Sequence, residues 1–517
     1  MNNIGELFLR AVEEHGRKTA VIYKDRKISY RQLAQKVAEL ATTLRAAGIR
    51  RGDVVGIYGI HSPMHILAIF AAALNDAAFQ ILHVANLPEG IKHQIADSGA
   101  RFLLGEKSWI KRIEGTLHDR SVQIIELDEW GARGSSRTQA GAKGLRSLIP
   151  RNIPTDVANI IYTSGSTGLA KGVVIPHRTL LDGARIVSGY LNITEKDVIL
   201  SILPFSFDYG LNQLMSVISQ GATIVMHNFV TPNDLIRVAR QAKVTGLAAV
   251  PSFWPNFFNP KLVHPKAGQS IRTLRYITTA GGPHGKKLLL ALTKYFPQAK
   301  VIIMYGLTES FRSTYLPADL VLKKIGSIGK AVPEVEILIR NENGEDCRAG
   351  ERGELLHRGA FITHGYLNNP ELNKEKFIEM ETAGPGTLKE RVVRSGDLVS
   401  RDKEGFIYFH GRIDSQIKSY GFRISPTEVE QAALSFRGVS HAAAFGMPDP
   451  LAGQRVCLAY SRFDGEEKKT AELREHLRKK LPNYSVPAKI LFFKKMPTTS
   501  SGKINYPHLR AKVDGKN

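Results

Sequence analysis

The chemistry that is easiest to read in this sequence lies in one short segment, Ile160-Ile161-Tyr162-Thr163-Ser164-Gly165-Ser166-Thr167-Gly168-Leu169-Ala170-Lys171-Gly172. Its glycines allow a backbone to approach a ligand closely. Exposed backbone N–H groups, hydroxyls and an ammonium together bind oxyanions. The spacing is not Gly-x-x-x-x-Gly-Lys-Ser/Thr, and no helix plainly begins after the lysine. We expect a phosphate-binding loop of another kind, and a flexible hydroxyl-rich turn is the alternative. The residues expected to contact phosphate are Thr163, Ser164, Gly165, Ser166, Thr167, Gly168 and Lys171.

A second segment with a nucleotide-binding composition is Met304-Tyr305-Gly306-Leu307-Thr308-Glu309-Ser310. A predicted strand ends here in an aromatic residue, a glycine, a hydroxyl and a carboxylate. Tyr305 can stack on a base, and Thr308 can donate to a phosphate. Glu309 can hold Mg²⁺, which prefers oxygen ligands.

Two further segments add groups that a nucleotide enzyme uses. Arg394-Ser395-Gly396-Asp397-Leu398 is followed by Gly411-Arg412-Ile413-Asp414, and a carboxylate in such a turn can accept both hydroxyls of a ribose. Near the end, Thr498-Thr499-Ser500-Ser501-Gly502-Lys503-Ile504-Asn505 places a lysine after a flexible glycine, so that the lysine can enter and leave a site. A turn with a solvated charge explains each segment alone. The four segments together indicate a nucleotide site.

The elements that must position these segments follow an alternating pattern. Residues 30–41 have helical spacing, 54–58 read as a buried strand and 65–74 as a buried helix. Further strands are predicted at 222–226, 246–250, 274–278 and 301–304, which favours layered α/β structure with parallel strands. Strands dominate after about residue 325, for example at 336–339 and 353–356, and a helix is predicted to begin at Pro426. We expect a large N-terminal domain of layered α/β subdomains plus a β-rich subdomain, residues 1–413. A small mobile α+β C-terminal domain, residues 414–517, would follow a hinge near Asp414.

Composition limits the classes of function. The chain has 517 residues, a formal net charge of +23 and two cysteines, Cys347 and Cys457. The charge predicts attraction to anions, but the basic residues are dispersed and no nucleic-acid module is evident, so no nucleic-acid partner is expected. The cysteines are too few for a disulfide framework, and neither a signal peptide nor a membrane span is predicted. A cytoplasmic protein is the expectation.

With these four segments, the chain resembles the adenylate-forming superfamily of acyl-CoA synthetases, nonribosomal amino-acid activating domains and luciferases. The four segments occur in the family's order and span essentially the whole chain. Two longer motifs are similar to those of the exosortase-associated AMP-forming acyl-CoA ligases. They are Leu203-Pro204-Phe205-Ser206-Phe207-Asp208-Tyr209-Gly210 and Met304-Tyr305-Gly306-Leu307-Thr308-Glu309-Ser310-Phe311-Arg312-Ser313-Thr314-Tyr315-Leu316-Pro317.

The resemblance implies a role for each segment. The 163–171 loop would hold the β- and γ-phosphates of ATP, Tyr305 would lie against adenine, Thr308 would touch the α-phosphate and Glu309 would bind Mg²⁺. Asp397 and Arg412 would hold the ribose. Lys503 would bridge the carboxylate and the α-phosphate, with Lys171, Thr308 and Glu309 as the other catalytic groups. Asp414 would be the hinge, and Lys418 and Gly421 would lie on the loop presented to the thiol acceptor.

Asp208 bears on the identity of the acid. It stands where amino-acid activating relatives carry the aspartate that pairs with the substrate ammonium, and a carboxylate in a pocket is costly unless paired. The alternative is that Asp208 caps the helix that begins at Tyr209. Phe253 and Trp254 either wall the pocket or belong to the core. The residues expected to contact the acid are Phe207, Asp208, Tyr209, Trp254, Gly281 and Gly282.

The implied activity is an AMP-forming acyl-CoA ligase in the sphere of fatty acid metabolism. It would use ATP and Mg²⁺ to activate a carboxylic acid and CoA to accept it. A second reading is an amino-acid activating enzyme that loads the phosphopantetheine of an acyl or peptidyl carrier protein. Carrier proteins are usually acidic, and residues 415–517 carry 18 Lys and Arg against 9 Asp and Glu. A third reading, a non-catalytic nucleotide-binding protein, is disfavoured by the presence of Lys171, Glu309, Asp397 and Lys503.

Overall fold

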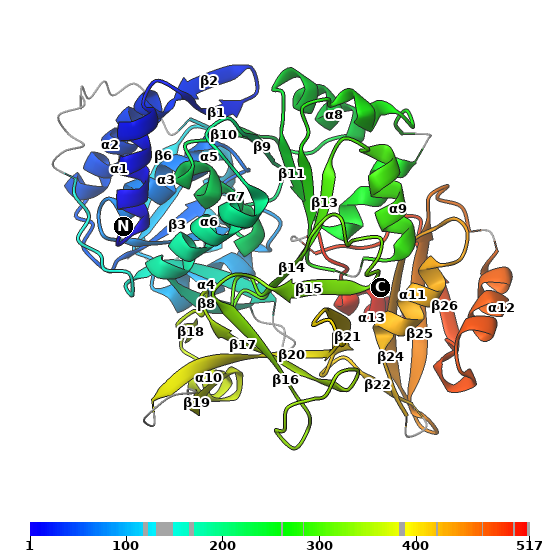
Figure 1. Cartoon of the computed structure of the whole chain (residues 1–517). Helices are drawn as coiled ribbons and strands as arrows, with labels where there is room; N and C mark the ends of the chain where they lie inside the picture. The colour runs from blue at the N-terminus through cyan, green and yellow to red at the C-terminus, as the bar shows by residue number, and fades with distance from the viewer. Residues whose placement is uncertain are drawn as a thin grey trace.

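Three β-sheets organise the computed structural model of the chain (Figure 1). The structure describes residues 1–116, 122–130, 148–164, 170–259, 262–282, 284–381, 388–419, 422–467, 469–499 and 502–513. Thirteen α-helices in these residues cover the sheets. They are α1 Ile4–His15, α2 Tyr30–Ala46, α3 Pro63–Ala73, α4 Pro88–Ser98, α5 Lys107–Ile113, α6 His177–Leu191, α7 Asp208–Ser219, α8 Pro232–Gln241, α9 Lys286–Tyr295, α10 Pro370–Lys376, α11 Pro426–Leu434, α12 Thr470–Lys480 and α13 Tyr506–Val513. Four short 3₁₀ helices are η1 Glu114–Thr116, η3 Pro251–Phe258, η4 Ala267–Ser270 and η5 Asn483–Ser485.

The largest sheet has 14 strands within the described residues and changes character along its length. Its first half is antiparallel, and its second half, from β13 through β12, β11 and β9 to β10 and β1, is parallel. Its order is β16 Val335–Arg340, β17 Arg352–Gly359, β20 Lys389–Arg401, β21 Ile407–Arg412, β15 Ser327–Ala331, β14 Thr314–Leu316, β13 Lys300–Tyr305, β12 Tyr276–Thr279, β11 Gly246–Ala249, β9 Val198–Ser201, β10 Thr223–Met226, β1 Thr19–Tyr23 and β2 Arg26–Ser29, with β19 Phe377–Glu381 paired to β20.

The second sheet has seven strands in the described part of the chain and carries the lysine of the predicted phosphate loop. Its order is β18 Gly365–Tyr366, β8 Ala170–Pro176, β7 Val157–Ser164, β4 Ala78–Leu82, β3 Val54–Tyr58, β5 Phe102–Glu106 and β6 Gln123–Leu127. β7 and β8 form an antiparallel pair in which Thr163 lies opposite Lys171. Lys171 is therefore in a strand, and the next helix, α6, begins only at His177, as the sequence indicated.

The third sheet belongs to the C-terminal part of the chain. Among the described residues it contains β23 Phe422–Ile424, β22 Ile417–Ser419, β25 Gly453–Arg462, β24 Val439–Asp449 and β26 Lys489–Phe492. Two apolar clusters lie against this sheet, one centred on Val429, Leu458 and Leu473 and the other on Phe445 and Leu509. This part of the chain thus has a core of its own.

The two parts of the chain contact each other through hydrogen bonds. Ser252 Oγ donates to the carbonyl oxygen of Gly502 at 2.6 Å, and His441 Nε2 lies 3.1 Å from the carbonyl oxygen of Ser252. Lys287 Nζ donates to the carbonyl oxygens of Ser435 and Phe436, at 2.7 and 2.9 Å. In Figure 1 the orange elements lie beside α9, and β24 contacts η3.

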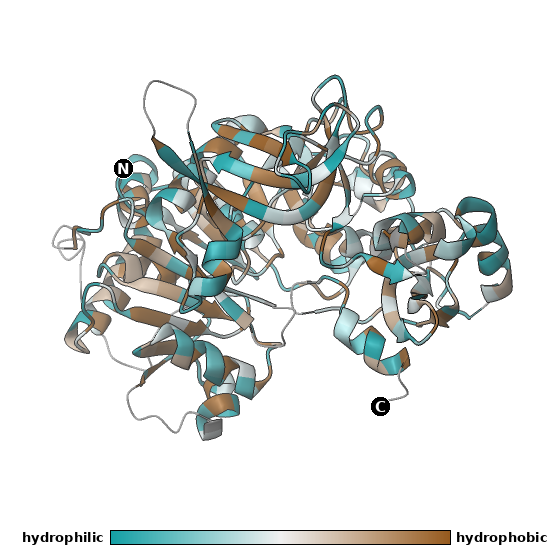
Figure 2. Ribbon diagram, turned by 90° about the horizontal axis from the view of Figure 1, so that it is seen from below, coloured by the Kyte–Doolittle hydropathy of each residue, from teal (hydrophilic) through white to brown (hydrophobic). Residues whose placement is uncertain are grey.

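The predicted layered α/β fold, with a large N-terminal and a small C-terminal domain, is confirmed. Each of the four parallel strands predicted between residues 222 and 304 is present, with bounds that shift by one or two residues. Such strands are buried on both faces, so their sequences are continuous apolar runs. Figure 2 shows brown, hydrophobic residues along the strands of the sheets. Within the described residues, no helix combines the length and apolarity needed to cross a membrane.

Candidate functional site

The site forms where parallel strands end. The carboxyl ends of adjacent parallel strands share one edge of a sheet, where ligands commonly bind. Gly281 and Gly282 follow β12, and Thr308 and Glu309 follow β13. Asp208 opens α7 after β9. Three segments far apart in sequence therefore meet at one edge.

Asp397 and Arg412 are cross-strand neighbours in β20 and β21. Tyr305 Oη donates a hydrogen bond of 2.5 Å to Asp397 Oδ2, and Arg412 Nη1 lies 3.3 Å from Oδ1. That Arg412 contact lacks hydrogen-bond alignment, so Oδ1 is buried without a hydrogen-bond partner in the described residues. Burial raises the pKa of Asp397 to about 6, against the opposing charge of Arg412 and the hydrogen bond from Tyr305. A buried acceptor without a donor matches a site that receives a hydroxyl from a ligand.

Glu309 has a partner that the sequence did not reveal. Tyr366 in β18 donates its hydroxyl to Glu309 Oε1. The next residue, Leu367, donates its backbone N–H to the carbonyl oxygen of Gly172 at 2.7 Å. Burial, and next the charge of Glu309, raise the pKa of Tyr366. Tyr366 therefore joins Glu309 of the large sheet to the strand that carries Lys171.

Lys503 reaches the same edge from the C-terminal part of the chain. Gly281 has a φ of +85°, and a Cβ placed on it would lie 3.7 Å from Lys503 Cε. Gly502 also has a positive φ, +77°, which glycine adopts without strain. The hydrogen bond from Ser252 to Gly502 holds this turn against the large domain.

Asp208 is half-buried at the start of α7. The residue before it, Phe207, is the N-cap and makes no side-chain cap hydrogen bond, so the reading of Asp208 as a helix cap is wrong. A first-turn carboxylate is still favourable to the helix dipole. Burial raises the pKa of Asp208, and the charges of Arg312 and Lys503 oppose that shift. Asp208 therefore lies within electrostatic reach of the terminal lysine.

Other predicted contacts are placed as follows. Tyr209 Oη donates to Thr278 Oγ1 at 2.7 Å, and the ring of Phe207 lies 5.6 Å from that of His83. Trp254 is fully buried in a core cluster and donates its indole N–H to Thr279 Oγ1 at 3.3 Å. This supports the core reading of Trp254 rather than the pocket-wall reading. Gly282 packs against Pro251.

The predicted hinge and acceptor-loop residues make the following contacts, and most residues of the predicted phosphate loop lie outside the described part of the chain. Arg412 Nε donates to Asp414 Oδ1 at 3.2 Å, and the backbone N–H of Lys418, in β22, donates to Gln454. Gly165, Ser166, Thr167, Gly168 and Gly421 lie outside the described residues, as does the side chain of Ser164.

Arg312 is a second residue that sequence reasoning gave no role. It lies within the motif of residues 304–317. Its side chain is buried beside Tyr209, with Cζ 5.1 Å from the ring centroid. The available signal was a lone cation in the segment 310–316, which otherwise holds only uncharged side chains.

Comparisons with known proteins found two matching family profiles and several relatives. The profile of the AMP-binding enzyme family matches residues 8–367, and that of the AMP-binding enzyme C-terminal domain matches residues 428–503. Bacitracin synthase 3 of Bacillus licheniformis is 31% identical over 508 residues, which cover 97% of this chain but only 8% of that protein. The chain thus spans less than a tenth of this relative. Zwittermicin A synthase ZmaJ of Bacillus cereus is 28% identical, over 97% of this chain and 93% of that protein.

Among solved structures, the chain is similar to o-succinylbenzoate coenzyme A synthetase of Bacillus subtilis in complex with ATP and magnesium ion. The TM-score is 0.82 and the identity 26%, and the match covers 99% of each chain. The same synthetase has also been solved with its acyl-adenylate intermediate, and that structure matches with a TM-score of 0.81 and 25% identity.

Proposed function

Because this chain belongs to the AMP-binding enzyme family and is an adenylate-forming enzyme, we propose that it is an acid–CoA ligase. In the first half-reaction, a carboxylate oxygen of the acid attacks the α-phosphorus of ATP, and pyrophosphate leaves. In the second, the sulfur of a thiol attacks the acyl carbonyl, and AMP leaves. The observation that carries this proposal is the approach of Lys503 to Gly281, at the edge that also holds Thr308 and Glu309.

The residues around Asp397 suit the nucleoside half of ATP. Asp397 Oδ1 is a buried acceptor without a hydrogen-bond donor in the described residues, and a ribose hydroxyl would supply one. Arg412 keeps a positive charge beside this carboxylate, and Tyr305 fixes its other oxygen. On the other sheet, Thr163 and Lys171 stand on paired strands that lead into the loop proposed to hold the outer phosphates.

Glu309 is the residue proposed to hold Mg²⁺. The described residues contain no group of three or more His, Cys, Asp or Glu side chains that could hold a metal. A single carboxylate nevertheless fits Mg²⁺, which is commonly held by one or two carboxylates together with substrate phosphates and water. When bound, the ion would neutralise charge on the phosphate oxygens. Tyr366 orients Glu309 for this task by donating to one carboxylate oxygen.

Lys503 would serve the first half-reaction. Its ammonium would lie between the incoming carboxylate and the α-phosphate and would stabilise the charge that develops there. Positioning is the main contribution of the protein to phosphoryl transfer of this kind. The hydrogen bonds from Ser252 and Lys287 hold the C-terminal part of the chain in the arrangement that this step needs.

The second half-reaction would need a different arrangement. We place the boundary between a domain of residues 1–413 and one of residues 414–517, with the hinge at Asp414. Rotation there would withdraw Lys503 and bring the segment with Lys418 and Gly421 to the site. Thioester formation would then proceed without the lysine.

CoA is the proposed thiol acceptor, and a carrier protein is the second candidate. The match over the full length of a coenzyme A synthetase supports CoA. The higher identity to bacitracin synthase 3 favours the second candidate. Pyrophosphate exchange across carboxylic and amino acids would identify the acid. Incubation of the resulting adenylate with CoA, or with a panel of phosphopantetheinylated carrier proteins, would then identify the acceptor. Transfer to a carrier protein but not to CoA would contradict our proposal.

A further inference from the structure

The most unusual side chain near the acid site is Arg312. Its residue is only 2% exposed, and Nε and Nη2 are buried without a hydrogen-bond partner in the described part of the chain. No carboxylate of a described residue forms an ion pair with it. Burying a guanidinium without hydrogen bonds is costly. Such a group calls for an explanation, and a ligand that completes its hydrogen bonds is one.

The backbone around Arg312 is held firmly. Phe311 has a φ of +50°, a left-handed conformation that a bulky residue rarely adopts. The Arg312 N–H donates to the carbonyl oxygen of Ser310 at 2.5 Å, which closes a tight turn. Ser313 Oγ lies 2.9 Å from His357 Nδ1, which anchors the next residue. Strain of this kind persists where the surroundings enforce it, and functional sites are where it concentrates.

Arg312 faces the elements that carry the acid site. Its Cζ lies 5.1 Å from the centroid of the Tyr209 ring, and its charge acts on Asp208, as does the charge of Lys503. Lys503 is the cation beside Gly281 and is thus available to the reacting carboxylate. Arg312 is therefore a second cation at the acid site, and it is available to bind a different group of the substrate.

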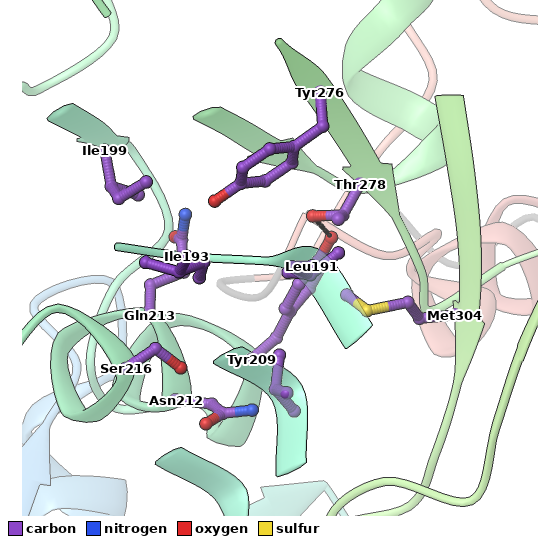
Figure 3. A pocket seen from close by; sticks show the side chains of 11 residues that line it. Leu191, Ile193, Ile199, Tyr209, Asn212, Gln213, Ser216, Tyr276, Thr278 and Met304 are labelled. Carbon is purple, nitrogen blue, oxygen red and sulfur yellow. Dashed lines mark hydrogen bonds between the residues drawn. The ribbon is translucent and has the colours of Figure 1, made fainter. Parts of the chain in front are cut away.

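The cavity beside Tyr209 has unpaired polar atoms in its lining. Figure 3 shows Asn212, Gln213 and Ser216 of α7 facing Tyr276 and Thr278 of β12 across it. Asn212 Oδ1, Gln213 Oε1 and Ser216 Oγ are buried and have no hydrogen-bond partner among described residues. The rest of the lining includes the apolar side chains of Val187, Leu191, Ile193, Ile199 and Met304.

We propose that the enzyme activates a short carboxylic acid with a second carboxylate, and that Arg312 binds this second carboxylate. The inference rests on the proposed function, since it assigns a substrate class to the same site. The planar guanidinium presents paired N–H donors that match the two oxygens of a carboxylate. The unpaired polar atoms of α7 select against an apolar chain, because an apolar ligand would leave them without partners.

The test compares acids of equal chain length in carboxylate-dependent pyrophosphate exchange: glutarate against valerate, and adipate against hexanoate. We expect the dicarboxylate of at least one pair to have a kcat/KM roughly 100-fold higher than its monocarboxylate partner, because the site's charged donor would otherwise remain unpaired. The Arg312→Gln variant should lose this preference. The Arg312→Lys variant should raise KM for the dicarboxylate and largely retain kcat. Arg178→Gln, which alters an exposed arginine of α6, is the matched control and should behave as the wild type.

The possible outcomes distinguish a failure of the inferred substrate class from a failure of the proposed function. Exchange with monocarboxylates at least equal to that with dicarboxylates, or an unchanged preference in Arg312→Gln, would overturn the inference and leave the proposed function intact. Absence of exchange with every carboxylic and amino acid, in a protein that binds ATP, would overturn the proposed function itself. Should Arg312→Gln fail to show the cooperative thermal transition of the wild type, Arg312→Lys alone decides through its KM.

Discussion

Tyr305 and Asp397, 92 residues apart, share a hydrogen bond of 2.5 Å between the end of β13 and the middle of β20. Burial raises the pKa of Asp397 to about 6. A carboxylate accepts ribose hydroxyls best when it is ionised, so we expect the affinity for AMP to fall as the pH decreases through 6. Isothermal titration with AMP between pH 5 and 8 measures this.

The same shift makes a prediction about stability. The folded-state pKa of Asp397 lies above its usual value of 3.8. The contribution of Asp397 to the free energy of unfolding is therefore complete below about pH 4 and is lost as the pH rises through 6. Asp397→Asn removes this pH dependence. Between pH 4 and pH 7, the difference in free energy of unfolding between the variant and the wild type should therefore shift in favour of the variant, by up to about 3 kcal/mol. Asp25→Asn, at an exposed carboxylate, is the control. A pH-independent difference between Asp397→Asn and the wild type would show that Asp397 is not the titrating group.

Tyr366→Phe should weaken the use of Mg²⁺. The variant keeps the ring and removes the hydroxyl that orients Glu309. Loss of such a supporting hydrogen bond commonly costs roughly tenfold or more in metal affinity. The half-saturating Mg²⁺ concentration in pyrophosphate exchange should rise accordingly. Tyr408→Phe removes a hydroxyl that is bonded to Asp402 instead, and it should leave the Mg²⁺ dependence unchanged. An equal effect of both variants would argue against a specific role for Tyr366.

Two adjacent lysines of α9 offer a test of domain docking. Lys287 donates to the carbonyl oxygens of Ser435 and Phe436, whereas its exposed neighbour Lys286 makes no such contact in the described structure. Each hydrogen bond is worth about 1 kcal/mol. Loss of both bonds costs about 2 kcal/mol, so Lys287→Ala should slow pyrophosphate exchange by roughly 30-fold and affect thioester formation from acyl-AMP less. Lys286→Ala should change neither rate. If both variants behave alike, the contact does not stabilise the arrangement used for adenylation.

The sequence predicted best the elements whose signals are local. The strands at 246–250 and 301–304 are apolar runs, and Gly281, Thr308 and Glu309 follow strand ends in the order that places them at one edge. Tyr366 could not be found in this way. Its contact with Glu309 depends on the pairing of β18 with β8, whose residues lie about 190 positions apart.

Arg312 was missed for a related reason. An arginine in a short polar segment is read as a solvated charge, because most arginines are exposed. Its burial follows from the turn at Phe311 and from the packing of that turn against Gly306. A Cβ on Gly306 would lie 2.6 Å from the carbonyl oxygen of Phe311. The alternative role of Asp208 as a helix cap could be excluded only once the N-cap was seen to be Phe207.

Lys503→Ala should separate the two half-reactions. The side chain lies beside Gly281 and acts electrostatically on Asp208, so its loss removes the cation proposed to bridge the acid and the α-phosphate. We expect carboxylate-dependent pyrophosphate exchange to be abolished, and thioester formation from preformed acyl-AMP to remain largely intact, because a rotated C-terminal domain would not use this lysine. Lys495→Ala, which removes an exposed lysine of the same domain, controls for the change in charge. Equal loss of both half-reactions in Lys503→Ala would mean that the lysine supports the whole site, and the assignment of one domain arrangement to each step would fail.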